Sequence, residues 1–172
     1  GLANRRHMDG FTDLAWSEAL RRGRPFGLLL LDVDNFKKYN DGYGHQAGDD
    51  CLRAIAGAVA GVVESTNAEG LTKGALAARY GGEEFCVVLP EVQAPAYEYV
   101  ASAIVDAVRA LAIPHENNAG IGIATVSVGG ARLESAGGFD QPGGAQLGAL
   151  FRLADERLYR AKQEGRNRAC LD

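Results

Sequence analysis

The chain has 172 residues, of which 47% are hydrophobic and 23% charged, a composition typical of one globular domain with its own core. Its net charge of −4 at pH 7 argues against binding to nucleic acid or an acidic membrane, so an anionic ligand would need a metal ion or locally placed Lys and Arg. No apolar run approaches the ~18 residues of a membrane span, and the three cysteines lack paired spacing, so we expect reduced thiols and a cytoplasmic domain.

Apolar periodicity divides the chain into alternating helices and strands. Helices are expected over about 5–22, 35–40, 50–64, 95–111 and 147–164. Strands are expected over 26–31, 75–78, 85–89 and 123–128. Loops are expected over 41–49, 65–74, 114–120 and 133–146. This order suits one sheet that contains an antiparallel hairpin and has helices packed on it.

The apolar run 26–31 is typical of a strand buried on both faces, and two carboxylates follow it. Asp32 and Asp34 lie on one side of the strand, because side chains alternate with a period of two. Asp34 could cap the next helix, whereas Asp32 would be costly to bury without a partner. Four further polar residues within a few turns suggest a ligand site, although each could instead be a solvated, turn, loop or helix-cap residue: Lys37, Asn40, His45 and Asp49.

Gly81-Gly82 joins two short β-prone runs and predicts a tight hairpin of the primed type, which needs φ above zero at its tip. Glu83 and Glu84 follow at the mouth of the second strand. Adjacent carboxylates repel unless water or a cation separates them. Two solvated acids at a turn are the plain alternative to a metal or catalytic site.

The last predicted helix ends at Gly165, a natural residue to follow a helix C-terminus. Lys162 and Arg166 lie at that end. They could bind an anion, or they could simply complement the helix dipole, which is worth only ~0.3–1 kcal/mol for each cation.

Taken together, these motifs closely resemble the GGDEF family of diguanylate cyclases, in the GGEEF form of its signature. The resemblance covers essentially the whole chain, so we expect residues 1–172 to form a single domain. It rests on the joint occurrence and order of Asn4-Arg5-Arg6, Asp32-Val33-Asp34-Asn35-Phe36-Lys37, Asn40-Asp41, Gly44-His45, Gly48-Asp49, Arg79-Tyr80-Gly81-Gly82-Glu83-Glu84-Phe85, Val126-Ser127-Val128-Gly129, Ala154-Asp155, Ala161-Lys162 and Gly165-Arg166-Asn167.

The resemblance implies an α/β (α+β) fold, a five-stranded mixed central sheet flanked by helices and similar to the palm of nucleotide polymerases and cyclases. It also implies an enzyme, a nucleotidyltransferase that condenses two GTP molecules into cyclic di-GMP and releases two pyrophosphates. Such a product is a bacterial second messenger associated with biofilm signalling.

The family's metal and catalytic roles transfer to matching positions of this chain. Asp32, Glu83 and the carbonyl of Val33 match ligands of Mg²⁺ or Mn²⁺, with two ions expected at each site. Glu84 matches a third acid, tied to metal binding and to activation of the attacking 3′-hydroxyl. The catalytic turn as a whole comprises Gly81, Gly82, Glu83 and Glu84.

The family's substrate roles transfer in the same way. Asn40 and Asp49 match the pair that reads guanine, and a carboxylate suits the two N–H donors that guanine offers beside an acceptor. The remaining substrate-binding positions, mainly facing the triphosphate, are Lys37 with the backbone near Phe36, His45, Lys162 and Arg166.

Two departures from the family pattern affect regulation. The family's inhibitory product site is an Arg-x-x-Asp motif ahead of the signature, and Thr72 and Ala75 occupy the matching positions, so we expect that site to be absent. The Asp-x-Leu-Thr element that usually precedes Gly-Leu would lie before Gly1, so we expect a sensory or regulatory region outside this sequence, which could tether the full-length protein to a membrane.

One GTP site in each chain implies a transient homodimer during catalysis, with no role for nucleic acid. The alternative is a catalytically silent receptor for GTP or cyclic di-GMP, but such relatives usually lose a signature acid or a base-reading residue. A cyclase for mixed GMP–AMP dinucleotides would favour a small hydroxyl residue at position 49, and Asp49 argues against it.

Overall fold

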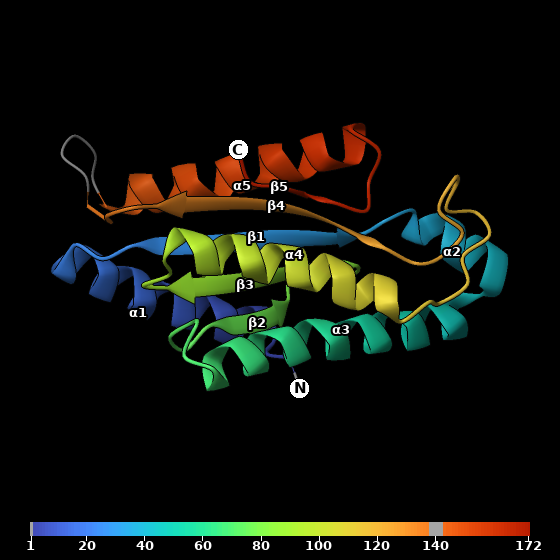
Figure 1. Cartoon of the computed structure of the whole chain (residues 1–172), viewed down its shortest axis with the longest axis horizontal. Helices are drawn as coiled ribbons and strands as arrows, with labels where there is room; N and C mark the ends of the chain where they lie inside the picture. Colours follow the sequence, from blue (N-terminus) through green and yellow to red (C-terminus); the bar gives the residue numbers. More distant parts are fainter. Residues whose placement is uncertain (1, 138–142) are drawn as a thin grey trace.

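Figure 1 shows the computed structural model, which describes residues 2–137 and 143–172. The helices are α1 (Arg5–Arg22), α2 (Phe36–Tyr43), α3 (His45–Ala68), α4 (Ala94–Ala110) and α5 (Gly143–Gln163). The strands are β1 (Phe26–Val33), β2 (Leu76–Arg79), β3 (Glu84–Pro90), β4 (Val126–Leu133) and β5 (Ala169–Cys170).

The strands form one five-stranded mixed sheet in the order β2-β3-β1-β4-β5. The central strand β1 pairs antiparallel with β3 and with β4, and β4 pairs parallel with β5. This confirms the predicted fold class. The residues themselves had indicated four of the strands, and the two-residue β5 was expected only through the family resemblance.

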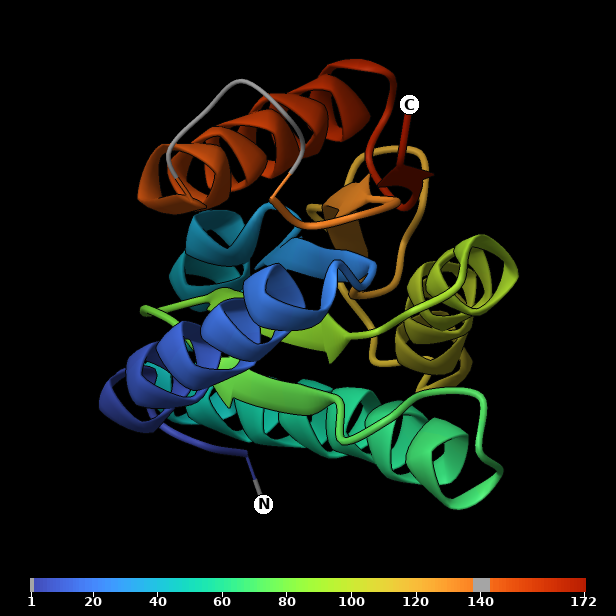
Figure 2. The same cartoon turned by 90° about the vertical axis from the view of Figure 1, so that its left-hand side faces the viewer.

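Helices cover both faces of the sheet, with α3 and α4 on one face and α1 and α5 on the other (Figure 2). The alternation of β1 explains both layers. Leu29 and Leu31 pack into the core beside α3 and α4, whereas Phe26 and Leu28 pack into the core beside α1 and α5. All four are at most 1% exposed, and burying side chains of this kind contributes about 1.5–3 kcal/mol each. The strand is therefore buried on both faces, as predicted.

The predicted loop over 41–49 is wrong. The helix α2 continues to Tyr43, Gly44 alone breaks the chain with a φ of 89°, and α3 begins at once at His45. Because a positive φ costs glycine little, one residue suffices to separate two helices. The first turns of α3 carry few apolar side chains, which is why periodicity placed its start near residue 50. At its other end α3 extends to Ala68, into the predicted loop 65–74.

The strand expected over 123–128 begins and ends later, as β4. Its second half passes through Gly129 and Gly130, which have low strand propensity. Gly129 is required by packing, because a Cβ atom there would lie 2.1 Å from backbone atoms of Ala154 and Leu158 on α5. Part of the surface excursion expected over 133–146, residues 138–142, lies outside the described residues.

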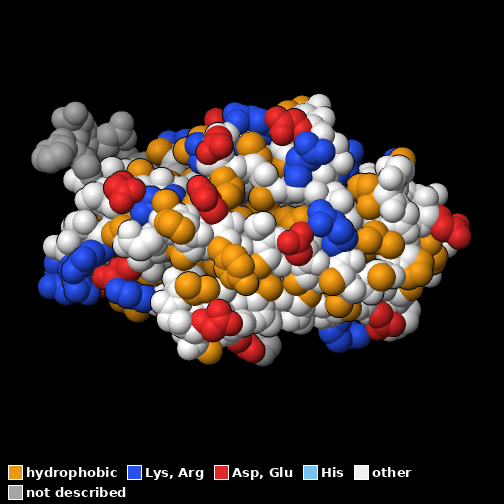
Figure 3. Space-filling view, in the orientation of Figure 1, with side chains coloured by type: hydrophobic (Ala, Val, Ile, Leu, Met, Phe, Trp, Pro, Cys, Tyr) orange, Lys and Arg blue, Asp and Glu red, His pale blue; other side chains and the backbone are white. Residues whose placement is uncertain are grey.

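The surface facing the viewer in Figure 3 has acidic and basic side chains interspersed among hydrophobic ones, and no basic patch gathers on that face. In the part of the chain that the structure describes, no helix is long and apolar enough to cross a membrane. The predicted core position of Cys86 is confirmed, since the residue is fully buried, and burial raises the pKa of its thiol to about 12.

Candidate active site

The end of β1 brings together residues from both neighbouring strands. Asp32 is only 8% exposed, and it lies opposite Glu84 on β3 and Ser127 on β4. The backbone N–H of Val33 donates to the carbonyl oxygen of Glu83 at 3.2 Å. The sheet therefore places the signature acids beside the end of the central strand, as the family resemblance implied.

The hairpin turn, Tyr80–Glu83, joins β2 to β3 and is closed by local contacts. The N–H of Tyr80 donates to the carbonyl of Glu84 at 2.8 Å, and the guanidinium of Arg79 donates to the carbonyl of Gly82 at 2.6 and 3.0 Å. The expected primed turn is wrong, because neither Gly81 nor Gly82 has a positive φ. A Cβ atom at Gly82 would meet nothing within 4 Å, so the chain's own packing does not require glycine there.

Asp32 has the partner that its burial demands. The ammonium of Lys162, near the end of α5, lies 2.6 Å from the Asp32 carboxylate, in a pair whose side chains are 31% and 11% exposed. Glu83 is half-buried, and burial, reinforced by the charges of Asp32 and Glu84, raises the pKa of its carboxyl, while Lys162 opposes the shift. Glu84 is exposed. The result is a compact group of charges with one cation among three acids.

These acids are suited to a hard divalent cation. Mg²⁺ is bound by oxygen and usually takes one or two carboxylates, with phosphate oxygens and water completing its shell. Asp32 and Glu83 supply such oxygens, so the donor set fits the predicted ion. The described residues contain no group of three or more His, Cys, Asp or Glu side chains close enough to hold a metal by themselves. A metal held by Asp32 and Glu83 would complete its shell with other oxygens, such as a backbone carbonyl, water or phosphate.

The two residues expected to read guanine meet at the junction of α2 and α3. The Oδ1 atom of Asn40 is buried and has no hydrogen-bond partner among the described residues. It lies against Gly48, where a Cβ atom would come within 1.7 Å of it, and Asp49 follows directly. Asp49 is exposed and lies inside α3, which begins at His45, so the alternative of a helix cap is excluded. The orphaned acceptor of Asn40 is the clearest sign of a missing polar partner.

The remaining substrate candidates differ in exposure. Lys37 on the first turn of α2 and His45 on the first turn of α3 are exposed. Phe36 is buried and stacks on Tyr39, with ring centroids 6.0 Å apart, so only its backbone could face a ligand. Arg166 is half-buried just after α5. Lys162 and Arg166 thus both stand at the end of α5, although only Lys162 has a salt bridge to an active-site acid.

Asp34 has a role that the residue pattern did not reveal. The suggestion that it caps α2 is wrong, because the residue before that helix is Asn35, and no side-chain cap is formed. Asp34 is 1% exposed and accepts hydrogen bonds from the hydroxyls of Thr125 and Ser127 at 2.7 and 2.6 Å. The signal available in the sequence was the alternation of Thr125 and Ser127 on a buried strand, where hydroxyls need a partner.

The positions that match the family's inhibitory motif are occupied by an internal network. Thr72 is buried, and its hydroxyl is 3.0 Å from that of Thr66 and 2.6 Å from Oδ1 of Asn67. Ala75 is also buried, and its backbone N–H and carbonyl both bond to the amide group of Asn67. These positions therefore present no charged side chain to a ligand.

Comparison with known proteins agrees with this geometry. The family model described as diguanylate cyclase, GGDEF domain, matches residues 1–168. Diguanylate cyclase DgcM of Escherichia coli is 35% identical over 168 residues, which make up 98% of this chain and 36% of that relative. The chain thus spans about a third of the length of this curated relative.

Two solved structures show the same architecture. The GGDEF domain of DgcB from Caulobacter crescentus, in complex with c-di-GMP, has 32% identity and a TM-score of 0.74, covering 99% of this chain and 91% of that one. The active GGEEF domain of a diguanylate cyclase from Vibrio cholerae has 29% identity and a TM-score of 0.76, covering 99% and 97%. The chain belongs to the GGDEF family of diguanylate cyclase domains, a family of nucleotidyltransferase-type enzymes.

Proposed function

We propose that this chain is an active diguanylate cyclase domain, which condenses two GTP molecules into cyclic di-GMP and releases two pyrophosphates. The observation that carries the proposal is the meeting of Asp32, Glu83 and Glu84 at the end of the central strands, with Lys162 bound to Asp32. Support also comes from relatives that are named diguanylate cyclases and from a neighbour solved with c-di-GMP.

Asp32, Glu83 and the Val33 carbonyl would hold Mg²⁺ or Mn²⁺, two ions at each site, and Glu84 would assist with the metal and the attacking hydroxyl. Bound metal would neutralise charge on the triphosphate and align the 3′-hydroxyl with the α-phosphorus. The open space at Gly82 leaves room for the substrate to approach the backbone of the hairpin turn closely.

Asn40 and Asp49 would select guanine. The Asp49 carboxylate is exposed and can accept from the N1–H and the amino group of guanine, and Asn40 completes the recognition of that edge. The unpartnered Oδ1 of Asn40 is an acceptor, so it would take an N–H of the guanine amino group, while the NH2 group of Asn40 could donate to an acceptor on the base. Adenine would present an acceptor to Asp49, so GTP is favoured over ATP.

Lys162, Arg166 and Lys37, with the backbone near Phe36 and with His45 close by, would surround the triphosphate. These cations allow a chain of net charge −4 to bind a highly charged anion, because attraction depends on the local field. In this account Lys162 can pair either with the Asp32 carboxylate or with a phosphate of the substrate. Binding of GTP with metal would favour the pair with phosphate.

The product requires two GTP molecules, so two chains would face each other about a two-fold axis, each contributing one nucleotide. Because Thr72 and Ala75 replace the residues of the inhibitory motif, we also propose that product does not inhibit through that site. The whole protein would act as a cytoplasmic signalling enzyme.

The test is incubation of the purified chain with GTP and Mg²⁺, and separately with Mn²⁺, followed by chromatographic separation of the nucleotides. The proposal expects cyclic di-GMP and pyrophosphate, with no product after chelation of metal. A folded, concentrated sample that forms no product with either metal but still binds cyclic di-GMP would instead establish the silent receptor.

A further inference from the structure

The segment Gly165–Asn167, the braced turn, follows α5 directly and has an unusual backbone. Its three residues have φ values of 120°, 64° and 52° in succession. Glycine tolerates such values, but a non-glycine residue in this region costs of order 1–3 kcal/mol. Arg166, a proposed triphosphate ligand, is one of the residues so held. The turn begins with local bonds, because the N–H groups of Gly165 and Arg166 donate to the carbonyls of Lys162 and Ala161 at the end of α5. Contacts from distant residues then hold the part of the turn that follows.

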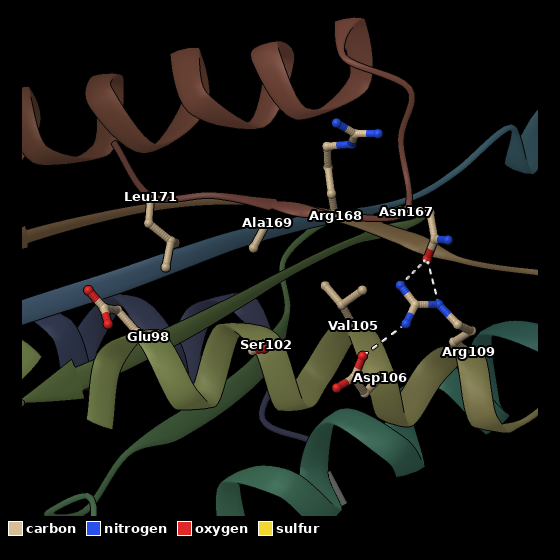
Figure 4. A pocket seen from close by; sticks show the side chains of 9 residues that line it. All are labelled: Glu98, Ser102, Val105, Asp106, Arg109, Asn167, Arg168, Ala169 and Leu171. Atoms are coloured by element: carbon tan, nitrogen blue, oxygen red, sulfur yellow. Dashed lines mark hydrogen bonds and ion pairs between the residues drawn. The ribbon is translucent and has the colours of Figure 1, made fainter. Parts of the chain in front are cut away.

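Two such contacts meet at Asn167. Its backbone N–H donates to Oδ2 of Asp34 at 3.0 Å. Its side-chain Oδ1 accepts from Nε and Nη2 of Arg109 at 3.2 and 3.0 Å, and Figure 4 shows this fork reaching across from α4. The other Nη of Arg109 donates to Asp106 at 2.9 Å, which fixes the guanidinium plane on its own helix.

Asp34 is itself held in place by hydrogen bonds from other residues. The hydroxyls of Thr125 and Ser127 donate to its two oxygens, and its backbone N–H donates to the carbonyl of Thr125 at 2.9 Å. The side chain of Asn118 donates to the Thr125 hydroxyl at 3.1 Å and accepts from Asn35 at 2.8 Å. The braced turn is thus tied to β1, to β4, to the start of α2 and, through Arg109, to α4.

Arg166 has no side-chain hydrogen bond or salt bridge among the described residues, so its guanidinium is available to a ligand. We propose that Asp34 and Arg109 are positioning residues that hold the braced turn and thereby aim Arg166 at the triphosphate. This rests on the proposed function, because it assumes that GTP binds beside Lys162 and Arg166. Neither Asp34 nor Arg109 touches the nucleotide in this account.

Arg109 offers the cleaner test because its side chain is 43% exposed, so its truncation leaves the core intact. Binding of a non-hydrolysable GTP analogue, with Mg²⁺ present, is measured by calorimetry for wild type, Arg109→Ala, Arg166→Ala and the double variant. We expect Arg109→Ala to weaken binding about five- to tenfold in wild type and to have little further effect when Arg166 is already alanine.

Two controls separate positioning from general damage. Arg21→Ala removes another exposed arginine with an i,i+3 acidic partner, Glu18, remote from the site, and should leave affinity unchanged. GMP carries no β- or γ-phosphate, so its affinity should be unaffected by Arg109→Ala. Asp34→Asn should reproduce the loss for the triphosphate, and if this variant fails to fold, the Arg109 series still decides.

The inference is overturned if Arg109→Ala weakens GTP analogue and GMP equally, if it leaves the GTP analogue unaffected, or if its effect is undiminished without Arg166. A wild-type chain that binds no GTP analogue would overturn the proposed function and this inference with it. A wild-type chain that binds normally but shows no coupling between Arg109 and Arg166 would overturn the inference alone.

Discussion

The braced turn and the hairpin turn flank the end of β1 on opposite sides, and they are held in different ways. The hairpin turn is closed by its own backbone and by its neighbour Arg79, and it uses no positive φ. The braced turn needs three positive φ values, with Asp34 and Arg109 bonded to it from distant parts of the sequence. Both turns have local bonds, but only the braced turn is also held by residues from distant parts of the sequence.

The junction of α2 and α3 resembles the hairpin turn in this respect. A single residue, Gly44, encodes it, and both His45 and Asp49 are exposed. The residues of Tyr80–Glu83 and His45–Asp49 are exposed or half-buried, except the buried Gly48, and we name these exposed and half-buried residues the exposed rim. The comparison teaches that side chains on the exposed rim can change with little effect on stability, so their substitution reports on chemistry. Substitutions at the braced turn should change both stability and activity.

The largest effect should come from Glu83→Gln on the exposed rim. Loss of one metal-binding carboxylate should lower activity by about 10²-fold or more, comparable to removing one electrostatic stabiliser of a transition state. Without metal, the unfolding free energy should stay within about 0.5 kcal/mol of wild type, as for most surface changes. Turnover assays and chemical denaturation check both. Retained activity would show that Glu83 is not a ligand of the proposed metal.

Asp49→Ser, also on the exposed rim, should change specificity. Removing the carboxylate should weaken discrimination of GTP against ATP by about 1–3 kcal/mol, the value of one hydrogen-bonding group that bound guanine would bury. Competition between the two nucleotides measures the ratio, and thermal melting should match wild type. An unchanged preference for GTP would show that Asp49 does not read the base.

A matched pair of glycine substitutions sharpens the comparison. Gly165→Ala places a side chain at a φ of 120° in the braced turn, so it should cost about 1–3 kcal/mol of stability. Gly82→Ala meets open space and no positive φ, so stability should change by less than about 0.5 kcal/mol. Activity should nevertheless fall about tenfold for Gly82→Ala, because the methyl group would obstruct the close approach of the phosphates. If both variants lost equal stability, the two turns would not differ as argued.

The smallest effect concerns His115, in the loop before β4. The ring is 1% exposed, packs edge-on against Tyr39 at 5.1 Å, and has no hydrogen bond at either nitrogen among the described residues. Burial lowers its pKa, an effect that the nearby carboxylate of Asp34 opposes and Lys38 reinforces. A neutral ring is therefore preferred in the folded state.

The lowered pKa of His115 makes the folded state less stable at acidic pH. Above the ordinary pKa of 6.5 the stabilisation is complete, and it is lost as the pH falls through the lower folded-state pKa, because the unfolded chain binds the proton more tightly. Between those two values the loss approaches about 1.4 kcal/mol for each pH unit. Urea unfolding of wild type and His115→Phe between pH 7.5 and 5 measures the difference, and identical slopes would contradict it.

The sequence predicted those features that short-range patterns encode. The amphipathic α1, the doubly buried β1 and the hairpin around Gly81 and Gly82 lie where periodicity placed them. Periodicity did not locate the start of α3, because a single glycine replaces a loop, nor the second half of β4, because Gly129 is selected by the close approach of α5. The two-residue β5 is too short to carry a pattern.

The candidate active site likewise contains some features that the sequence predicted and others that depend on contacts between distant residues. The family resemblance implied that Asp32 and the signature acids share one site, and the cation Lys162 supplies the partner that Asp32 needs. The role of Asp34 could not be predicted, because its bonds join residues 91, 93 and 133 positions away. Such pairings exist only once the sheet and the braced turn have formed.

The central claim is that this chain joins two GTP molecules by bringing two chains together. Its most direct test is the amount of cyclic di-GMP formed per milligram of protein, measured with Mg²⁺ across a wide dilution series. Because positioning of reactants supplies most of the catalysis in phosphoryl transfer, specific activity should rise with protein concentration, and a leucine zipper fused ahead of Gly1 should raise it further. A specific activity that stays flat in a sample shown to be monomeric, or the absence of product at every concentration, would contradict the account.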